Sequence, residues 1–241
     1  MQHVVAISGG KDSTAMALLL AEREPRDYTY VCTPTGDELP EWFEHMRHLA
    51  GILGKPILPV VGGTLNGLVD HWQALPNWRQ RWCTRKLKIE PFAAWMMAQP
   101  KPLTSYVGLR ADEPERDGGD YAAVPEVELR YPLREWEMGE ADVLNYLGQR
   151  DIRIPERTDC ARCFYQTLGE WWKLWKDHPE IYADIEAQEA AIGFTWRSPG
   201  RDTWPAPLID LRAEFERGKV PQGNPGQRDL FKGLQCRVCR L

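Results

Sequence analysis

The sequence predicts an α/β fold, in which a mostly parallel sheet carries helices on both of its faces. Apolar, strand-like runs alternate with helix-like segments through the first 150 residues, an order typical of parallel sheets. A glycine pair directly follows the first apolar run, at the sheet edge where such folds bind ligands. After residue 151 strand character is lost and two C-x-x-C pairs occur. We therefore expect an α/β domain over 1–150 and a small, mainly helical, cysteine-containing C-terminal subdomain over 151–241.

Each expected element follows from a local pattern. Short runs of apolar, β-branched or aromatic residues predict five strands, over Val4–Ile7, Tyr28–Cys32, Pro56–Val61, Leu103–Val107 and Val127–Leu133. Segments with helical periodicity predict helices over Thr14–Arg23, Pro40–Leu53, Thr84–Met97 and Glu140–Gln149. In the subdomain, Leu168–Ile192 is helix-like and Ser198–Gly226 is rich in proline and glycine.

Composition excludes several classes of protein. The chain has 241 residues, of which 43% are hydrophobic and 27% charged, so it is unlike an intrinsically disordered chain. Its 30 Lys and Arg against 35 Asp and Glu give a net charge of −5, so any polyanion site must be a local patch. No run approaches the roughly 20 apolar residues of a membrane span, and no basic segment precedes an apolar one at the N-terminus. We expect a cytoplasmic protein without a membrane partner.

The segment from Ser8 to Ser13, with the sequence SGGKDS, has the features of a phosphate-binding loop. Adjacent glycines let backbone N–H groups turn toward an anion, and the following helix N-terminus adds partial positive charge. Lys11 supplies a full charge, the two serines supply hydroxyls, and Asp12 can orient Lys11 or help to hold Mg²⁺. Lys11 and Asp12 are expected to be exposed on this loop. The segment matches neither the Walker A nor the G-x-G-x-x-G pattern, and the alternative is a plain capped turn.

The loop resembles the SGGKDS loop of the PP-loop ATP pyrophosphatases, also called the adenine nucleotide α-hydrolase superfamily. Three further segments are similar to the phosphoadenosine phosphosulfate (PAPS) reductase-like branch. They are Thr35–Glu38 (TGDE), Cys83–Pro91 (CTRKLKIEP) and Gly108–Glu113 (GLRADE). The similarity extends over residues 1–165. Trp82 stands where that branch has the first cysteine of an adjacent pair.

The resemblance implies a Rossmann-like domain that binds an adenine nucleotide, with ATP and Mg²⁺ as cofactors. It implies catalytic roles for Lys11, Asp12, Ser13 and Arg110. It also implies that the nucleotide contacts Ser8, Gly9, Gly10, Lys11, Asp12, Ser13, Gly36, Asp37, Arg85, Lys86, Gly108 and Arg110. Many members of the superfamily cleave ATP between its α- and β-phosphates to activate an acceptor as an adenylate.

Three hypotheses account for the cysteines. In the first, Cys83, Cys160 and Cys163 bind a [4Fe–4S] cluster, as similar cysteines do in the adenylylsulfate reductases, with Cys236 or Cys239 as a fourth ligand or one iron left open. In the second, the two C-x-x-C pairs, Cys160/Cys163 and Cys236/Cys239, form a structural Zn²⁺ site. In the third, they are redox thiols that relay a disulfide or persulfide.

Aromatic and basic residues are interleaved between Arg79 and Lys88, with Trp78 and Trp82 among five basic side chains and no acid. Such a segment suits a nucleic acid or a nucleotide's outer phosphates, although a solvated helix face explains it equally well. The cluster Trp171, Trp172 and Trp175 is at helical spacing and favours a packed core.

The leading functional hypothesis is therefore an ATP-using sulfur transferase that thiolates tRNA or a DNA backbone, supplied by a cysteine desulfurase or another sulfur donor. The first alternative is a sulfonucleotide reductase acting on PAPS or adenylylsulfate. The second is a zinc-stapled nucleotide- or nucleic-acid-binding module without catalysis. The sequence leaves a homodimer open.

Overall fold

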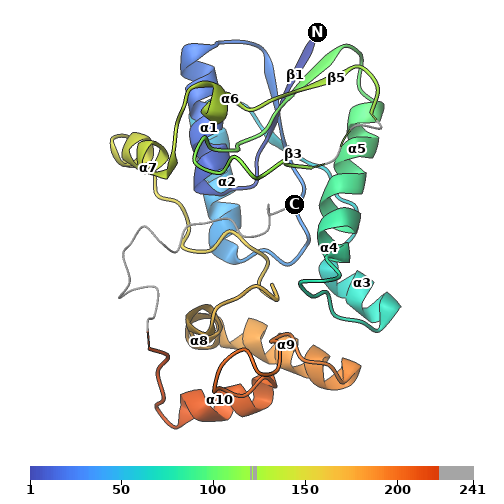
Figure 1. Ribbon diagram of the computed structural model, residues 1–241, viewed down its shortest axis with the longest axis vertical. Helices are drawn as coiled ribbons and strands as arrows, with labels where there is room; N and C mark the ends of the chain where they lie inside the picture. The colour runs from blue at the N-terminus through green and yellow to red at the C-terminus, as the bar shows by residue number, and fades with distance from the viewer. Residues whose placement is uncertain (120, 122–123, 223–241) are drawn as a thin grey trace.

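In the computed structural model, five parallel strands form the central sheet, with helices on both faces (Figure 1). The structure describes residues 1–119, 121 and 124–222. The strands are β1 (Gln2–Ala6), β2 (Tyr28–Cys32), β3 (Ile57–Pro59), β4 (Leu103–Tyr106) and β5 (Val127–Arg130), in the order β3-β2-β1-β4-β5. All four pairings are parallel. The predicted α/β class is confirmed.

Alternating side chains of β1 pack on opposite faces of the sheet. Val5 is fully buried in a core formed with α1 (Lys11–Arg23), α2 (Pro40–Leu53) and α7 (Glu140–Gly148). Val4, also fully buried, packs on the other face with Phe92 and Met96 of α5 (Glu90–Met97). This follows from the period of two in a strand, which sends neighbouring side chains to opposite faces.

Two predicted helices are interrupted. The segment predicted as Thr84–Met97 consists of α4 (Trp82–Thr84), a π-helical turn η1 (Arg85–Ile89) and α5. Pro91 near the start of α5 has no N–H to donate to the preceding turn, and a widened turn accommodates it. The predicted stretch Leu168–Ile192 is likewise two helices, α8 (Leu168–Asp177) and α9 (Pro179–Ile192), because Pro179 begins a new helix.

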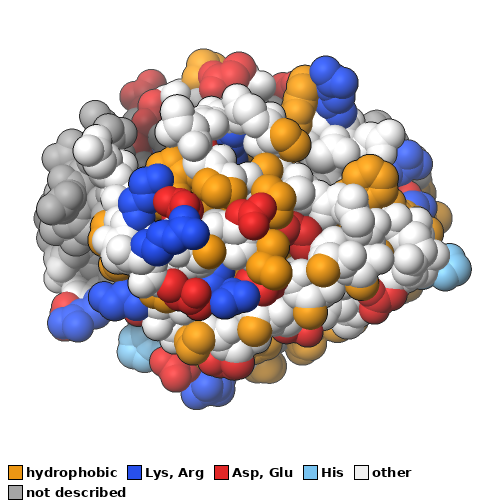
Figure 2. Space-filling view, turned by 90° about the horizontal axis from the view of Figure 1, so that it is seen from below, with side chains coloured by type: hydrophobic (Ala, Val, Ile, Leu, Met, Phe, Trp, Pro, Cys, Tyr) orange, Lys and Arg blue, Asp and Glu red, His pale blue; other side chains and the backbone are white. Residues whose placement is uncertain are grey.

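Three helices were not anticipated by the pattern. They are α3 (Leu65–Trp72), the short α6 (Pro132–Glu135), where β5 ends earlier than predicted, and α10 (Leu208–Glu216) within the Pro/Gly-rich run. The helices α8, α9 and α10 share a hydrophobic core with Leu65 and Val69 of α3. Trp171 is fully buried in this core, which confirms that the tryptophan cluster packs internally. At this end of the molecule, acidic, basic and hydrophobic side chains are intermixed on the surface (Figure 2).

Within the described residues, no helix has both the length and the apolarity to cross a membrane.

The order of the strands fixes where a ligand can bind. From β1 the chain continues to β2 on one side, whereas β4 lies on the other side of β1. Loops that leave the carboxyl ends of β1 and β4 therefore diverge and open a crevice between them. The SGGKDS segment follows β1, and Gly108 follows β4.

Candidate functional site

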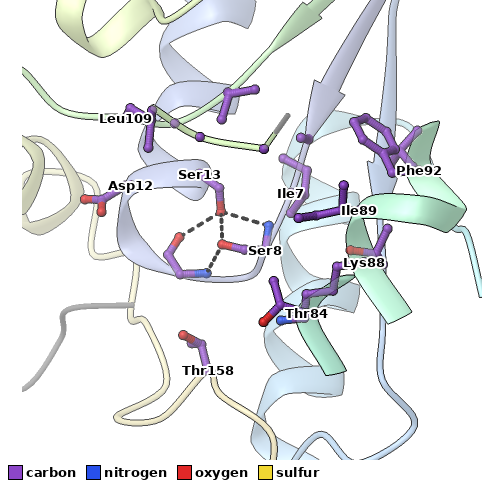
Figure 3. Close-up of a pocket in the computed structure, with 18 of the residues that line it drawn as sticks. Ile7, Ser8, Asp12, Ser13, Thr84, Lys88, Ile89, Phe92, Leu109 and Thr158 are labelled. Atoms are coloured by element: carbon purple, nitrogen blue, oxygen red, sulfur yellow. Dashed lines mark hydrogen bonds between the residues drawn. The ribbon is translucent and has the colours of Figure 1, made fainter. Parts of the chain in front are cut away.

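The SGGKDS segment is closed by its own two serines (Figure 3). The Ser13 hydroxyl accepts from the Ser8 N–H at 3.1 Å and donates to the Gly10 carbonyl at 3.1 Å. The Ser8 hydroxyl lies 3.0 Å from that of Ser13 and accepts from the Gly10 N–H at 3.3 Å. These bonds hold the loop in shape before any ligand arrives, so the backbone does not have to order itself on binding.

Glycine is required twice at this loop. Gly9 has φ +83°, and a Cβ there would lie 2.3 Å from Nε1 of Trp42. That indole N–H donates to the Ser8 carbonyl at 2.9 Å and fixes the loop against α2. A Cβ on Gly108 would lie 3.1 Å from the Ser13 backbone. Two of the predicted glycines therefore allow the loop to approach its neighbours closely.

A cavity of about 170 Å³ opens beside the loop. Its polar end is formed by Ser8, Gly10, Asp12 and Ser13, and Gly108 lies beside them. Ile89 and Phe92 form an apolar wall beside the loop, and Leu109 lines the cavity near Asp12 and Ser13 (Figure 3). A polar, N–H-rich end next to an apolar wall suits a molecule that joins phosphates to a flat ring.

Lys11 and Asp12 are buried, which corrects the expectation that they are exposed. Lys11 is 1% exposed, and its Nζ lies 3.3 Å from Oε1 of Glu140 and 3.9 Å from Oδ1 of Asp12. Helix α1 begins at Lys11, three residues earlier than predicted, so both side chains are held on the first helical turn and packed beneath the loop. Lys11 does not appear among the residues that line the cavity, whereas Asp12 does.

Arg110, buried at 2% exposure, is tied to three carboxylates. Its Nη1 donates to Asp12 Oδ2 at 2.9 Å, its Nε to Asp112 Oδ1 at 2.8 Å, and its Nη2 lies 3.4 Å from Glu113. Burial raises the pKa of Asp12, against the opposing effect of Lys11 and Arg110. Asp12 Oδ1 is buried and accepts no hydrogen bond from the part of the chain that the structure describes, so it is the loop atom best suited to a cation. One carboxylate together with substrate phosphates is a common way to hold Mg²⁺.

Asp37 faces the subdomain and is not among the cavity-lining residues. Its carboxylate accepts from the Arg162 Nε at 2.7 Å and the Arg162 backbone N–H at 2.9 Å. Its carbonyl accepts from the Ala161 N–H at 2.6 Å. Gly36, with φ +74°, packs against Thr64. The residue of this segment that lines the cavity is Glu38.

The π-helical turn decides which basic residue reaches the site. Arg85 and Lys86 both pair with the half-buried Glu90, Arg85 through a 2.8 Å bond from its Nε. Neither basic residue lines the cavity. Lys88 does line it. The sequence placed Lys88 only within the basic segment, because a pattern of residue types does not reveal a widened turn.

Three cysteines line a second, smaller cavity. Cys83 of α4 and the pair Cys160 and Cys163 border it together, and Thr84 and Lys88 border both cavities. The Cys163 thiol lowers the pKa of Cys160 by hydrogen bonding to it, and the Lys88 ammonium acts in the same direction against burial. Burial raises the pKa of Cys83 to about 11. Cys32, at the end of β2, is buried in the core, as predicted.

The donor chemistry of these cysteines fits both metal hypotheses, because thiolates bind iron–sulfur clusters and zinc alike. Among the described side chains, however, no group of three or more His, Cys, Asp or Glu is gathered closely enough to hold one ion. Cys236 and Cys239 lie outside the described residues. The cluster and the zinc site therefore remain predictions.

The basic segment is divided in the structure. Trp82 packs edge-on against Trp72 with ring centroids 4.7 Å apart. Trp78 is 59% exposed and carries the Arg79 guanidinium over its ring at 4.6 Å. Arg81 lines the cysteine cavity and lies over the ring of Tyr165. The exposed pair Trp78 and Arg79 thus lies just before Arg81 in the chain, and Arg81 lines the cysteine cavity.

Fold and site together define a parallel α/β protein with a nucleotide-type phosphate loop at its topological switch point. The family model for the phosphoadenosine phosphosulfate reductase domain matches residues 2–173. The chain belongs to this family, which confirms the resemblance predicted from the motifs.

The chain is also similar to two relatives and to one solved structure. The chain is 24% identical over 211 residues to an uncharacterized nin region protein of Escherichia phage lambda, covering 73% of this chain and 70% of the phage protein. It is 22% identical to an uncharacterized protein of Methanocaldococcus jannaschii, covering 83% of this chain but only 45% of the archaeal one. The fold is similar to that of PAPS reductase from Candida auris, solved as a phosphate complex, with a TM-score of 0.50 at 13% identity over 65% of this chain and 76% of that one.

Proposed function

We propose that the chain is an ATP-dependent sulfur-transfer enzyme, with a nucleic acid (tRNA or DNA) as the acceptor. The observation that carries the proposal is the shared wall between the two cavities. Thr84 and Lys88 border both the cavity of the phosphate loop and the cavity of the three cysteines. A nucleotide whose phosphates lie at the loop would have its reacting end next to sulfur.

The first step is activation of the acceptor. An acceptor oxygen attacks the α-phosphorus of ATP, the bond to the bridging oxygen breaks, and pyrophosphate leaves. The loop N–H groups and the Ser8 hydroxyl would hold the phosphates, Asp12 would hold Mg²⁺, and Lys88 would offset charge on the transferred phosphoryl group. The Mg²⁺ supplies charge neutralisation between the phosphates.

The second step is sulfur transfer. Sulfur delivered by a cysteine desulfurase or another donor is held at Cys83, Cys160 and Cys163 as a persulfide, whose outer sulfur bonds to the activated atom of the acceptor while AMP leaves. A neighbouring cysteine thiolate then attacks the cysteine sulfur of the resulting disulfide, so that the S–S bond to the acceptor breaks and the thiolated acceptor leaves. An external thiol reduces the cysteine disulfide that remains. Cys160 and Cys163 border the cysteine cavity together with Lys88, so a nucleophilic sulfur on either thiol of this pair would lie beside a positive charge. A thiolate-bound cluster at the same residues is compatible with this role, and with the positive charge of Lys88 beside it.

The acceptor would approach over Trp78 and Arg79. A base can stack on the exposed indole while the guanidinium meets a phosphate. In this proposal the described part of the chain supplies a nucleotide site, a sulfur site beside it, and an aromatic and basic pair that docks the acceptor.

A sulfonucleotide reductase is the second candidate, favoured by the family model and by the fold similarity to a PAPS reductase. In that case a cysteine thiolate attacks the sulfur of PAPS or adenylylsulfate and the nucleotide leaves without pyrophosphate.

One assay separates the two. The anaerobically purified chain is incubated with ATP, Mg²⁺, a sulfur donor, a thiol reductant and either tRNA or DNA, and in parallel with PAPS or adenylylsulfate and the same thiol. Acceptor-dependent pyrophosphate and thiolated nucleic acid support sulfur transfer, whereas sulfite supports the reductase. Cys160→Ser should abolish the product in either case. Cys32→Ser, a cysteine buried in the sheet, is the matched control.

A further inference from the structure

Lys11, the charged residue of the phosphate loop, is held by a carboxylate from another element. The Lys11 side chain is 1% exposed, and among the described ion pairs its Nζ lies 3.3 Å from Glu140 Oε1. Glu140 is the first residue of α7, 129 positions along the chain. Neither the motif nor the resemblance assigns this residue a role.

Glu140 is itself fixed in position. Its backbone N–H donates to Asp112 Oδ2 at 3.0 Å, and the other oxygen of Asp112 accepts from Arg110. Arg110 in turn donates to Asp12, beside Lys11. Helix α7 packs along α1 with Val143 in their common core. A ring of contacts therefore runs from Lys11 through Glu140, Asp112, Arg110 and Asp12 back to the loop.

The charged side chains around Lys11 do not attract an anion strongly when no ligand is bound. The basic members are Lys11, Arg110 and Arg116, and the acidic ones are Asp12, Asp112, Glu113 and Glu140. Arg116 lines the cavity but is bound to Glu113. The positive charge beneath the loop is thus already matched by carboxylates. Since such interactions are strong where water is largely excluded, an incoming polyphosphate has to compete for Lys11.

We propose that Glu140 competes with the bound polyphosphate for the Lys11 ammonium and thereby sets the affinity of the loop for pyrophosphate. With the site empty, Lys11 pairs with Glu140. When phosphates occupy the loop, the ammonium turns to them, and it returns to Glu140 as pyrophosphate leaves. Glu140 is a positioning residue that acts through Lys11. The inference rests on the proposed binding of ATP phosphates at this loop.

The test is direct binding of inorganic pyrophosphate with Mg²⁺, measured by calorimetry without nucleotide or acceptor. Glu140→Gln keeps the shape and an acceptor oxygen but removes the competing charge. It should bind pyrophosphate about tenfold more tightly than the wild type, a typical coupling between neighbouring sites. Glu44→Gln, the same change on the exposed side of α2, should leave the affinity unchanged.

Activity gives a second readout. If pyrophosphate is the product, Glu140→Gln should be inhibited by added pyrophosphate at about tenfold lower concentration. Unchanged or weaker binding of pyrophosphate by a folded Glu140→Gln variant would overturn the inference and leave the proposed function intact. If the wild type binds no pyrophosphate at all, the inference is wrong, and acceptor-dependent release of pyrophosphate from ATP decides the proposed function separately.

Discussion

Replacement of Asp37 by alanine should detach the cysteine loop from the sheet domain. Asp37 follows β2, and its carboxylate receives two hydrogen bonds from Arg162, the residue next to last in the segment Cys160–Cys163. Both side chains are almost completely buried. The Arg162 guanidinium also donates to Asp184 and Gln188 of α9, so one cation joins three parts of the chain.

The magnitude follows from burial. Removing one partner of a buried ion pair costs about 3–5 kcal/mol, because the other charge is left uncompensated. Arg162 retains Asp184, whose side chain is 63% exposed, so the lower end applies and the free energy of unfolding should fall by about 3 kcal/mol. Asp184→Ala removes an exposed partner of the same guanidinium and should cost less than about 1 kcal/mol.

Denaturant unfolding followed by tryptophan fluorescence measures both variants. A second measurement under native conditions follows the reaction of Cys160 and Cys163 with a thiol reagent, which should accelerate in Asp37→Ala and stay slow in Asp184→Ala. If Asp37→Ala is no less stable than Asp184→Ala, the buried pair does not hold the Cys160–Cys163 segment to the end of β2 and the reasoning fails.

Further expectations concern the loop, the core and the cysteines. Gly9→Ala should abolish nucleotide binding, measured by calorimetry, because its Cβ would meet the Trp42 ring at a backbone angle unsuited to alanine; normal affinity would contradict this. Burial lowers the pKa of His45 to about 4, so the unfolded chain binds more protons between pH 6.5 and 4. Stability should fall by up to about 3 kcal/mol as pH drops through that window, and His45→Gln should remove this dependence. Cys83→Ser should abolish thiolation but not nucleotide binding, whereas a Cys32→Ser variant that also loses thiolation would argue against a sulfur site.

Much of the candidate site could be predicted from the sequence. The loop residues are contiguous in the sequence. The requirement for glycine at Gly9 comes from the backbone conformation, and a glycine pair is easily recognised in a sequence. The order of strands and helices follows from local periodicity, which also explains why the α/β class was predicted correctly.

Other features of the structure could not be predicted from local sequence patterns. The break at Pro179 and the widened turn before Pro91 depend on how each proline is accommodated. At the widened turn, Lys88 lines the cavity in place of the predicted Lys86. The exposure of Lys11 and Asp12 was predicted wrongly, since α1 begins early enough to draw them under the loop.

The sequence by itself determined the fold class, the family and the chemical types of the groups available: a loop rich in glycine and hydroxyls, a lysine, a carboxylate and thiols. Only the tertiary structure decided which of them meet. It paired Asp37 with Arg162, Lys11 with Glu140, and the cysteine cavity with Lys88. The physical reason is that burial and pairing of charge depend on contacts between residues far apart in the chain, which local patterns do not encode.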